Sequence, residues 1–142
     1  MEIERMKISD IAEVLEIEKI SFASPWSIEM FEQELLMGRY FAAKEGGKII
    51  GYVGYQRVLD EGHITNLAVH PDFRRHGIGR KLVEKSVEEA KSSGLKSLIL
   101  EVREKNTAAQ KLYESLGFSN VGRRKGYYQE PVEDAILMAR NL

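Results

Sequence analysis

The chain contains no cysteine among its 142 residues. This absence excludes a disulfide framework, a thiolate metal site and a cysteine nucleophile. No apolar run approaches the roughly 20 residues that a membrane-spanning helix requires, and the first ten residues lack a secretory apolar stretch. Neither sign of charge is in excess, because the net charge is −1, so we expect no general attraction to nucleic acid or to a membrane surface. These absences favour a cytoplasmic protein.

Proline is scarce as well. The three prolines, Pro25, Pro71 and Pro131, lie far apart, and no proline-rich or serine-rich linker divides the chain. A length of 142 residues suits one domain, so we predict that residues 1–142 form a single domain. Hydrophobic residues make up 43% of the chain, which excludes general disorder.

Hydrophobic periodicity predicts both helices and strands. We expect strands near residues 2–8, 40–44, 48–58, 63–69, 98–102, 119–124 and 134–139, and helices near residues 10–22, 27–36, 78–94 and 107–116. Asp10 and Glu13 have the spacing of a capping box for the first helix. The strand–helix–strand order in the second half implies some parallel pairing, whereas the hairpins imply antiparallel pairing. The predicted fold class is therefore α/β (mixed α+β), layered around a twisted sheet.

The most informative segment follows a predicted strand and opens a predicted helix. It reads Val-His-Pro-Asp-Phe-Arg-Arg-His-Gly-Ile-Gly-Arg and spans residues 69–80. The N–H groups at a helix start attract an anion, and glycines let the anion approach closely. Arg74, Arg75 and Arg80 add charged donors, so a phosphate or diphosphate is the expected ligand. The alternative is a capped helix whose glycines serve packing and whose arginines are solvated.

Two common phosphate-binding motifs are absent from this segment. The chain has no Gly-x-x-x-x-Gly-Lys-Ser/Thr sequence, which excludes a P-loop. Only Gly77 and Gly79 match the three-glycine dinucleotide fingerprint, which is therefore incomplete.

The pattern Arg74-x-x-Gly77-x-Gly79 resembles the Arg/Gln-x-x-Gly-x-Gly/Ala signature of the GCN5-related N-acetyltransferases (GNAT). The resemblance runs over nearly the whole chain and implies the GNAT fold, a central twisted mixed sheet of about seven strands flanked by about four helices. It also implies acetyl-coenzyme A (acetyl-CoA) as the co-substrate, with no metal. The residues that it implies for acetyl-CoA binding are Leu67, Ala68, Val69, Arg74, Arg75, His76, Gly77, Ile78, Gly79, Arg80, Asn106 and Tyr113. An alternative role for Asn106 is to cap the following helix.

Other segments are similar to the branch of this family that acetylates the N-terminal alanine of a small-subunit ribosomal protein. They are Pro25-Trp26-Ser27, residues 100–103, residues 106–113, Tyr127-Tyr128 and residues 133–138. The resemblance implies direct transfer to the N-terminal α-amine of a ribosomal protein, by a monomer or weak homodimer that contacts neither nucleic acid nor membrane. Three alternatives stay open: a broad archaeal-type N-α-acetyltransferase, a small-amine or lysine acetyltransferase, and a non-catalytic CoA- or peptide-binding module.

Two residues are the catalytic candidates. Glu101 ends an otherwise apolar strand, where partial burial would raise its pKa, and the resemblance puts the family's base at this position. The alternatives are that Glu101 pairs with Arg103 or caps the next helix, and Glu61 and His63 are rival bases. The resemblance makes Tyr113 the acid that faces the leaving sulfur; the alternative is a core tyrosine.

The acceptor-binding candidates are Trp26, Glu61, Tyr127 and Tyr128. Trp26 is as well suited to cover the core, and only one of the two tyrosines is expected to face substrate, because neighbours on a strand point to opposite sides. The backbone N–H of Leu67 or Val69 is the expected donor to the thioester carbonyl. The basic run at residues 123–125 is either a solvated face or a guide for an acidic peptide.

Overall fold

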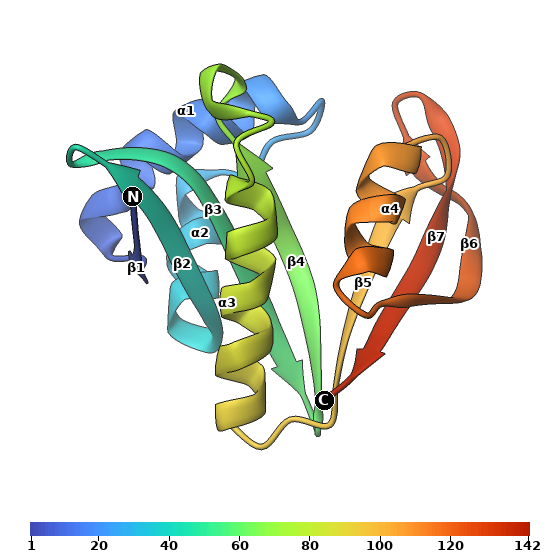
Figure 1. Ribbon diagram of the computed structural model, residues 1–142. Coiled ribbons are helices and arrows are strands. Elements are labelled where there is room, and N and C mark those ends of the chain that lie inside the picture. Colours follow the sequence, from blue (N-terminus) through green and yellow to red (C-terminus); the bar gives the residue numbers. More distant parts are fainter.

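The computed structural model describes all 142 residues. Seven strands form one sheet, and four α-helices cover its faces (Figure 1). The strands are β1 (Glu2–Arg5), β2 (Gly38–Glu45), β3 (Lys48–Val58), β4 (Glu61–Val69), β5 (Ser97–Arg103), β6 (Ser119–Gln129) and β7 (Val132–Asn141). The helices are α1 (Ile11–Ser21), α2 (Ile28–Met37), α3 (Ile78–Ser92) and α4 (Thr107–Ser115), with 3-10 turns η1 (Ile8–Asp10) and η2 (Pro71–Phe73).

The strand order in the sheet is β1-β2-β3-β4-β5-β7-β6, and every neighbouring pair is antiparallel except β4 and β5. The parallel pair is short, because it extends only from Glu61–Ser97 to His63–Ile99. Beyond that point the two strands diverge, and Figure 1 shows the resulting V between them. The mixed sheet with seven strands and four helices confirms the predicted fold class.

Two hydrophobic clusters occupy the two faces of the sheet. The larger lies beneath α3 and α4 and includes Leu82 and Val83, both fully buried. The smaller lies beneath α1 and α2 and includes Val14 and Phe31. The apolar residues of α3 recur at intervals of three and four, which gives that helix one buried face.

The N-terminal expectations need two corrections. The first strand ends at Arg5 rather than near residue 8, because the Lys7 N–H donates to Asp10 Oδ2 at 2.8 Å and closes turn η1. The capping box of Asp10 and Glu13 does not form. Glu13 instead accepts the Ile49 N–H at 3.1 Å, which fixes α1 to β3.

The final hairpin is longer than expected. β6 ends at Gln129, whereas the pattern predicted an end near residue 124. β7 begins at Val132, whereas the pattern predicted a start near residue 134. The register shifts between Arg124 and Tyr128, and Gly126 has a φ of 61° at this bulge. The bulge continues β6 past its basic run, so Tyr127 and Tyr128 lie on the strand.

A second bulge lies in the middle of β4. Gly54 pairs with Asn66 but Tyr55 pairs with Ile64, so Thr65 is the extra residue. The hydroxyl of Tyr40 contacts Thr65 Oγ1 at 2.8 Å. Beyond the bulge, Asn66 bonds to a residue of α1, whereas Leu67 packs against the cluster beneath α3.

Candidate active site

The open end of the V exposes backbone groups of β4. The His70 N–H donates to Ile50 O at 2.8 Å, which fixes the alternation of the antiparallel ladder with β3. Leu67 and Val69 therefore direct their N–H and C=O groups away from β3 and into the gap that β5 leaves. Arg74 Nε donates a hydrogen bond to the Val69 carbonyl at 3.0 Å. The N–H groups of Leu67 and Val69 remain available to a ligand in the gap.

The loop before α3 presents a row of free amides. The N–H groups of residues 75–80 donate to no backbone or side-chain acceptor of the protein. Arg75 and Gly77 have positive φ values of 66° and 76°, which help to turn successive N–H groups toward one side. Six consecutive donors at a helix N-terminus form a site that fits a diphosphate.

Packing does not explain the two glycines of this loop. A methyl group at Gly77 would meet nothing within 4 Å, although the positive φ there favours glycine. A methyl group at Gly79 would only touch Val69 Cγ2 at 3.8 Å. The space above both glycines is open, as an anion site requires.

The arginines of the loop differ in their contacts. Arg74 is held by the Val69 carbonyl, as described above, and Arg80 donates to Ser115 Oγ of α4 at 2.6 Å. Arg75 and His76 are exposed. An open groove of about 710 Å³ begins at Arg80 and runs between α3 and α4, with Lys91 and Arg140 among its lining residues.

Glu101 lies on β5 at the open part of the V. Its Oε1 is 3.5 Å from Arg124 Nε, and the side chain keeps 21% of its surface exposed. Arg103 turns away to Glu133, so the expected alternative of a Glu101–Arg103 pair does not form. The cap of α4 comes instead from Asn106 Oδ1, which accepts the Ala109 N–H at 3.1 Å and confirms the capping role of this residue.

The basic run on β6 is not a free charged face. Arg123 is within 2.8 Å of Glu104 and within 2.7 Å of Asp134, and Arg124 faces Glu101. These carboxylates pair with the two arginines of the run, whereas Lys125 is exposed.

Two candidate site residues are tyrosines with raised pKa values. Tyr113 is 8% exposed on α4, with its ring 6.0 Å from that of Phe118, and burial, with a smaller contribution from Tyr128, raises its pKa to about 12. Burial, followed by the charges of Tyr127 and Glu101, raises the pKa of Tyr128 to about 12 as well. Both phenols therefore stay protonated at neutral pH, and each can donate a hydrogen bond. Tyr127 is 48% exposed, so only Tyr128 of the pair turns inward.

Trp26 closes the smaller hydrophobic cluster. Its ring centroid lies 5.1 Å from that of Phe31 and 6.4 Å from that of Tyr40. The backbone N–H of Trp26 donates to Glu18 Oε2 at 2.9 Å. Trp26 thus covers the core, and its loop is anchored to α1.

Glu18 is a buried carboxylate that the sequence reasoning missed. It is 2% exposed and accepts hydrogen bonds from three neutral donors: Tyr52 Oη at 2.5 Å, Asn66 Nδ2 at 2.9 Å and the Trp26 N–H. Burial and the Glu18 charge raise the pKa of Tyr52, which keeps this phenol a donor. The network joins the α1–α2 loop to β4 at the point where β4 enters the gap.

The structure does not bring Glu61 to the other candidates. Glu61 begins β4 at the closed end of the V, where its Oε2 is 3.4 Å from the hydroxyl of its neighbour Ser97. His63 is half-buried and ends the paired part of β4. No group of three or more His, Asp or Glu side chains is arranged to hold a metal ion. None of the helices has the length and apolarity needed to cross a membrane.

Known proteins share this arrangement over nearly the full chain. The ribosomal protein bS18-alanine N-acetyltransferase of Escherichia coli (strain K12) is 40% identical over 142 residues, covering 96% of this chain and 95% of that protein. The crystal structure of the ribosomal-protein-S18-alanine N-acetyltransferase from Escherichia coli superposes with a TM-score of 0.92 at 38% identity, covering 99% of this chain and 92% of that one.

A second similar structure contains ligands. The NatC complex bound to Gag peptide and CoA has a chain that matches with a TM-score of 0.86 at 26% identity, covering 100% of this chain and 99% of that one. A family model described as the acetyltransferase (GNAT) family matches residues 11–118. The chain therefore belongs to the GNAT acetyltransferase family.

Proposed function

We propose that the chain transfers the acetyl group of acetyl-CoA directly to the N-terminal α-amine of a protein. The acceptor is the N-terminal alanine of ribosomal protein bS18, as the names of the relatives at about 40% identity suggest. The enzyme works as a single domain of residues 1–142 in the cytoplasm, where ribosomal proteins are made. It acts as a monomer or weak homodimer, without a metal and without contacting nucleic acid or membrane.

The main support for the donor is the row of six free amides at residues 75–80. These N–H groups and the positive end of α3 bind the diphosphate of acetyl-CoA, which supplies a thioester as the acetyl source. The pantetheine arm follows the free edge of β4, where the N–H of Leu67 or Val69 donates to the thioester carbonyl. The amide nitrogen of Asn106, whose oxygen caps α4, is left to contact the same arm.

Glu101 acts as the general base. An α-amine has a pKa of about 7.7–8.0, so about a quarter is already neutral near pH 7.4, and only modest assistance is needed. The amine nitrogen attacks the thioester carbon, the carbon–sulfur bond breaks, and the proton released from nitrogen passes to the Glu101 carboxylate, directly or through water. No covalent acyl-enzyme is formed.

Tyr113 stabilises the leaving thiolate by a hydrogen bond rather than by complete proton transfer. Its pKa of about 12 lies about 3.5 above the 8.5 of a free thiol, so complete transfer would cost about 5 kcal/mol. A hydrogen bond from the phenol avoids this cost and still lowers the energy of the departing sulfur.

Tyr128 and Trp26 bound the acceptor end, with Tyr127 at the exposed rim. The half-buried ring of Tyr128 and the anchored loop of Trp26 favour a small first residue such as alanine. Glu61, at the closed end of the V, is left out of this assignment.

The test is release of free thiol from acetyl-CoA in the presence of acceptor peptides. We expect turnover with a peptide that begins Ala-Arg and almost none with an N-blocked peptide that contains lysine. The reverse pattern would overturn the proposal in favour of a lysine acetyltransferase. Equal rates with many different first residues would overturn the alanine assignment and favour a broad N-α-acetyltransferase. Mass spectrometry of an N-terminal peptide library would then identify the tolerated residues.

A further inference from the structure

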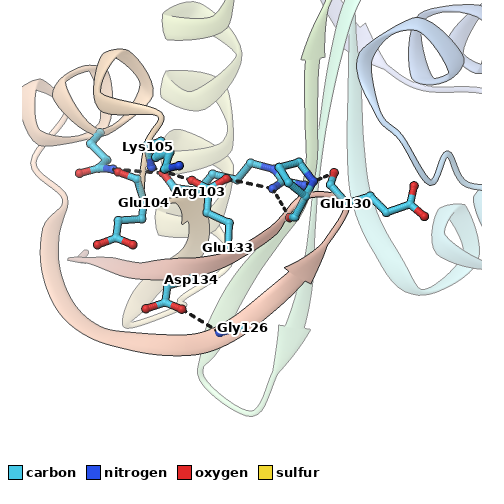
Figure 2. Close-up of polar contacts among 9 residues, drawn as sticks. Arg103, Glu104, Lys105, Gly126, Glu130, Glu133 and Asp134 are labelled. Atoms are coloured by element: carbon cyan, nitrogen blue, oxygen red, sulfur yellow. Dashed lines mark hydrogen bonds and ion pairs between the residues drawn. The ribbon is translucent and has the colours of Figure 1, made fainter.

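Arg103 makes an unusually complete set of contacts at the end of β5. Its Nη1 donates to Glu133 Oε1 at 3.0 Å and to the Pro131 carbonyl at 3.2 Å, and its Nη2 donates to the Glu130 carbonyl at 3.1 Å. The guanidinium carbon also lies 4.2 Å from the centroid of the Tyr128 ring. One side chain therefore contacts the tip of the β6–β7 hairpin at four points, and Figure 2 shows Arg103 between Glu130 and Glu133.

The same cluster includes the turn that leads into α4. The second carboxylate oxygen of Glu133 accepts the Lys105 N–H at 2.7 Å, and Asp134 Oδ1 accepts the Gly126 N–H at 2.8 Å (Figure 2). The end of β5, the β5–α4 turn and the hairpin tip are thus joined through polar contacts. We call Arg103, Glu133 and the carbonyls of residues 130 and 131 the Arg103 clamp.

Hydrophobic packing does not hold the hairpin tip. No residue between positions 119 and 134 is buried, and the core resumes only at Ala135. β6 is an edge strand, so its outer side has no neighbouring strand. The hairpin tip therefore has no buried core to fix it, and polar contacts, of which Arg103 makes the largest set, hold it against β5.

The clamp lies beside the candidate catalytic residues. Arg103 and Glu101 are two residues apart on β5 and so face the same side of the sheet. Tyr128, which rests on the guanidinium, lies on β6, the strand whose Arg124 faces Glu101. Movement of the guanidinium would therefore move an aromatic wall of the acceptor end without touching the donor loop at residues 75–80.

From this geometry we propose that Arg103 is a positioning residue for the acceptor: it holds Tyr128 and the hairpin tip over the open end of the V. The proposal rests on the proposed function, which assigns the acceptor to this end. Lysine cannot replace arginine here, because a single ammonium group cannot contact one carboxylate and two carbonyls in one plane while stacking on a ring.

The test compares Arg103→Lys with the native chain and with Arg57→Lys as the matched control. Arg57 is exposed and donates only to the nearby Leu59 carbonyl. For Arg103→Lys we expect the KM for a peptide beginning Ala-Arg to rise at least fivefold, while the KM for acetyl-CoA stays within twofold. Hydrogen exchange at residues 126–133 should accelerate at least tenfold, and exchange in β1–β4 should not change. Arg57→Lys should match the native chain in all three measurements.

A double-mutant cycle separates positioning from a general loss of stability. If Arg103 acts through Tyr128, Arg103→Lys should add less than twofold to the acceptor KM of a Tyr128→Leu variant. Should Arg103→Lys fail to fold, Glu133→Gln provides the same measurement, because it keeps one acceptor oxygen but removes the charge that Arg103 pairs with.

The outcomes distinguish the two proposals. An unchanged acceptor KM, an equal rise in both KM values, or additive effects in the cycle would overturn the role of Arg103 and leave the proposed function intact. If the native chain acetylated no peptide with a free N-terminus, the proposed function would fail, and the acceptor role of Arg103 would fail with it.

Discussion

Replacing Gly79 by glutamate should separate donor binding from stability. Gly79 is the second residue of α3, and a side chain there meets only Val69 Cγ2, at 3.8 Å from the new Cβ. Replacing a glycine within a helix stabilises the folded state by about 1 kcal/mol. A carboxylate in the first turn stabilises it by a further ~0.3–1 kcal/mol through its interaction with the helix dipole. The free energy of unfolding should therefore stay the same or rise by about 1–2 kcal/mol.

The affinity of the Gly79→Glu chain for coenzyme A should fall, in contrast to its stability. A carboxylate about 4 Å from a phosphate charge costs about 4 kcal/mol at the effective dielectric of a protein surface, which corresponds to about a thousandfold in affinity. The side chain can rotate partly into water, so we expect the dissociation constant of coenzyme A to rise between about tenfold and a thousandfold.

Calorimetric titration with coenzyme A, together with urea unfolding, measures both effects. Gly79→Ala is the matched control, since it has the same helical benefit without the charge; its affinity should stay within a few-fold of native. A folded Gly79→Glu chain that binds coenzyme A as tightly as the native chain would refute the assignment of residues 75–80 to the diphosphate.

Three further predictions follow from the same structure. Tyr113→Phe should lower kcat about tenfold to a hundredfold, the value of a charge-assisted hydrogen bond, with coenzyme A affinity within twofold; calorimetric loss of binding would make this tyrosine structural. Glu18→Ala leaves three buried donors unpaired and should cost about 3 kcal/mol or more in urea unfolding, whereas Glu16→Ala, exposed on the same helix, should stay within about 0.5 kcal/mol. Equal values for the two would contradict the network. The pKa of Glu133 is lowered by the Lys105 N–H and then by Arg103, and that of Asp134 by the Gly126 N–H and then by Arg123. A lowered folded-state pKa stabilises the hairpin above the unfolded value of about 4, and this stability is lost as pH falls through the folded value. Exchange at residues 126–133, corrected for intrinsic rates, should therefore accelerate below about pH 4 before the rest of the chain does, and uniform acceleration would argue against it.

The conformation of the loop before α3 could be predicted from sequence because its determinants are local. Residues 69–80 contain the strand end, the proline, both glycines and the helix start, and local backbone geometry largely sets the directions of the N–H groups. The bounds of α3 and the glycine hairpin between β2 and β3 could be predicted for the same reason.

The Glu18 network depends on contacts that no local pattern specifies. Glu18 lies four residues after Val14 on the buried stripe of α1, and a carboxylate on an apolar face is the one available signal. Its partners Tyr52 and Asn66 are 34 and 48 residues away in the sequence. The sequence could therefore suggest a buried carboxylate but not the residues that bind it.

The partner of Arg103 could not be predicted from sequence for the same reason. Glu101 is the nearby carboxylate in sequence, but the antiparallel register of β5 and β7 sets Arg103 opposite Ala135 and brings Glu133, 30 residues away, within reach. The continuation of β6 past its bulge brings the Tyr128 ring to the guanidinium.

The single extra residue in β4, Thr65, reverses the alternation of side-chain directions along the strand. A redesign that kept Thr65 but forced β4 into a regular ladder with β3 would exchange the two sides of residues 66–69, so Leu67 and Val69 would turn toward the Glu18 carboxylate and Asn66 toward apolar side chains. The N–H groups of Leu67 and Val69, which point away from β3, would then enter the ladder with β3. Any redesign that transplants this strand with position 65 into another sheet must therefore preserve the bulge as well.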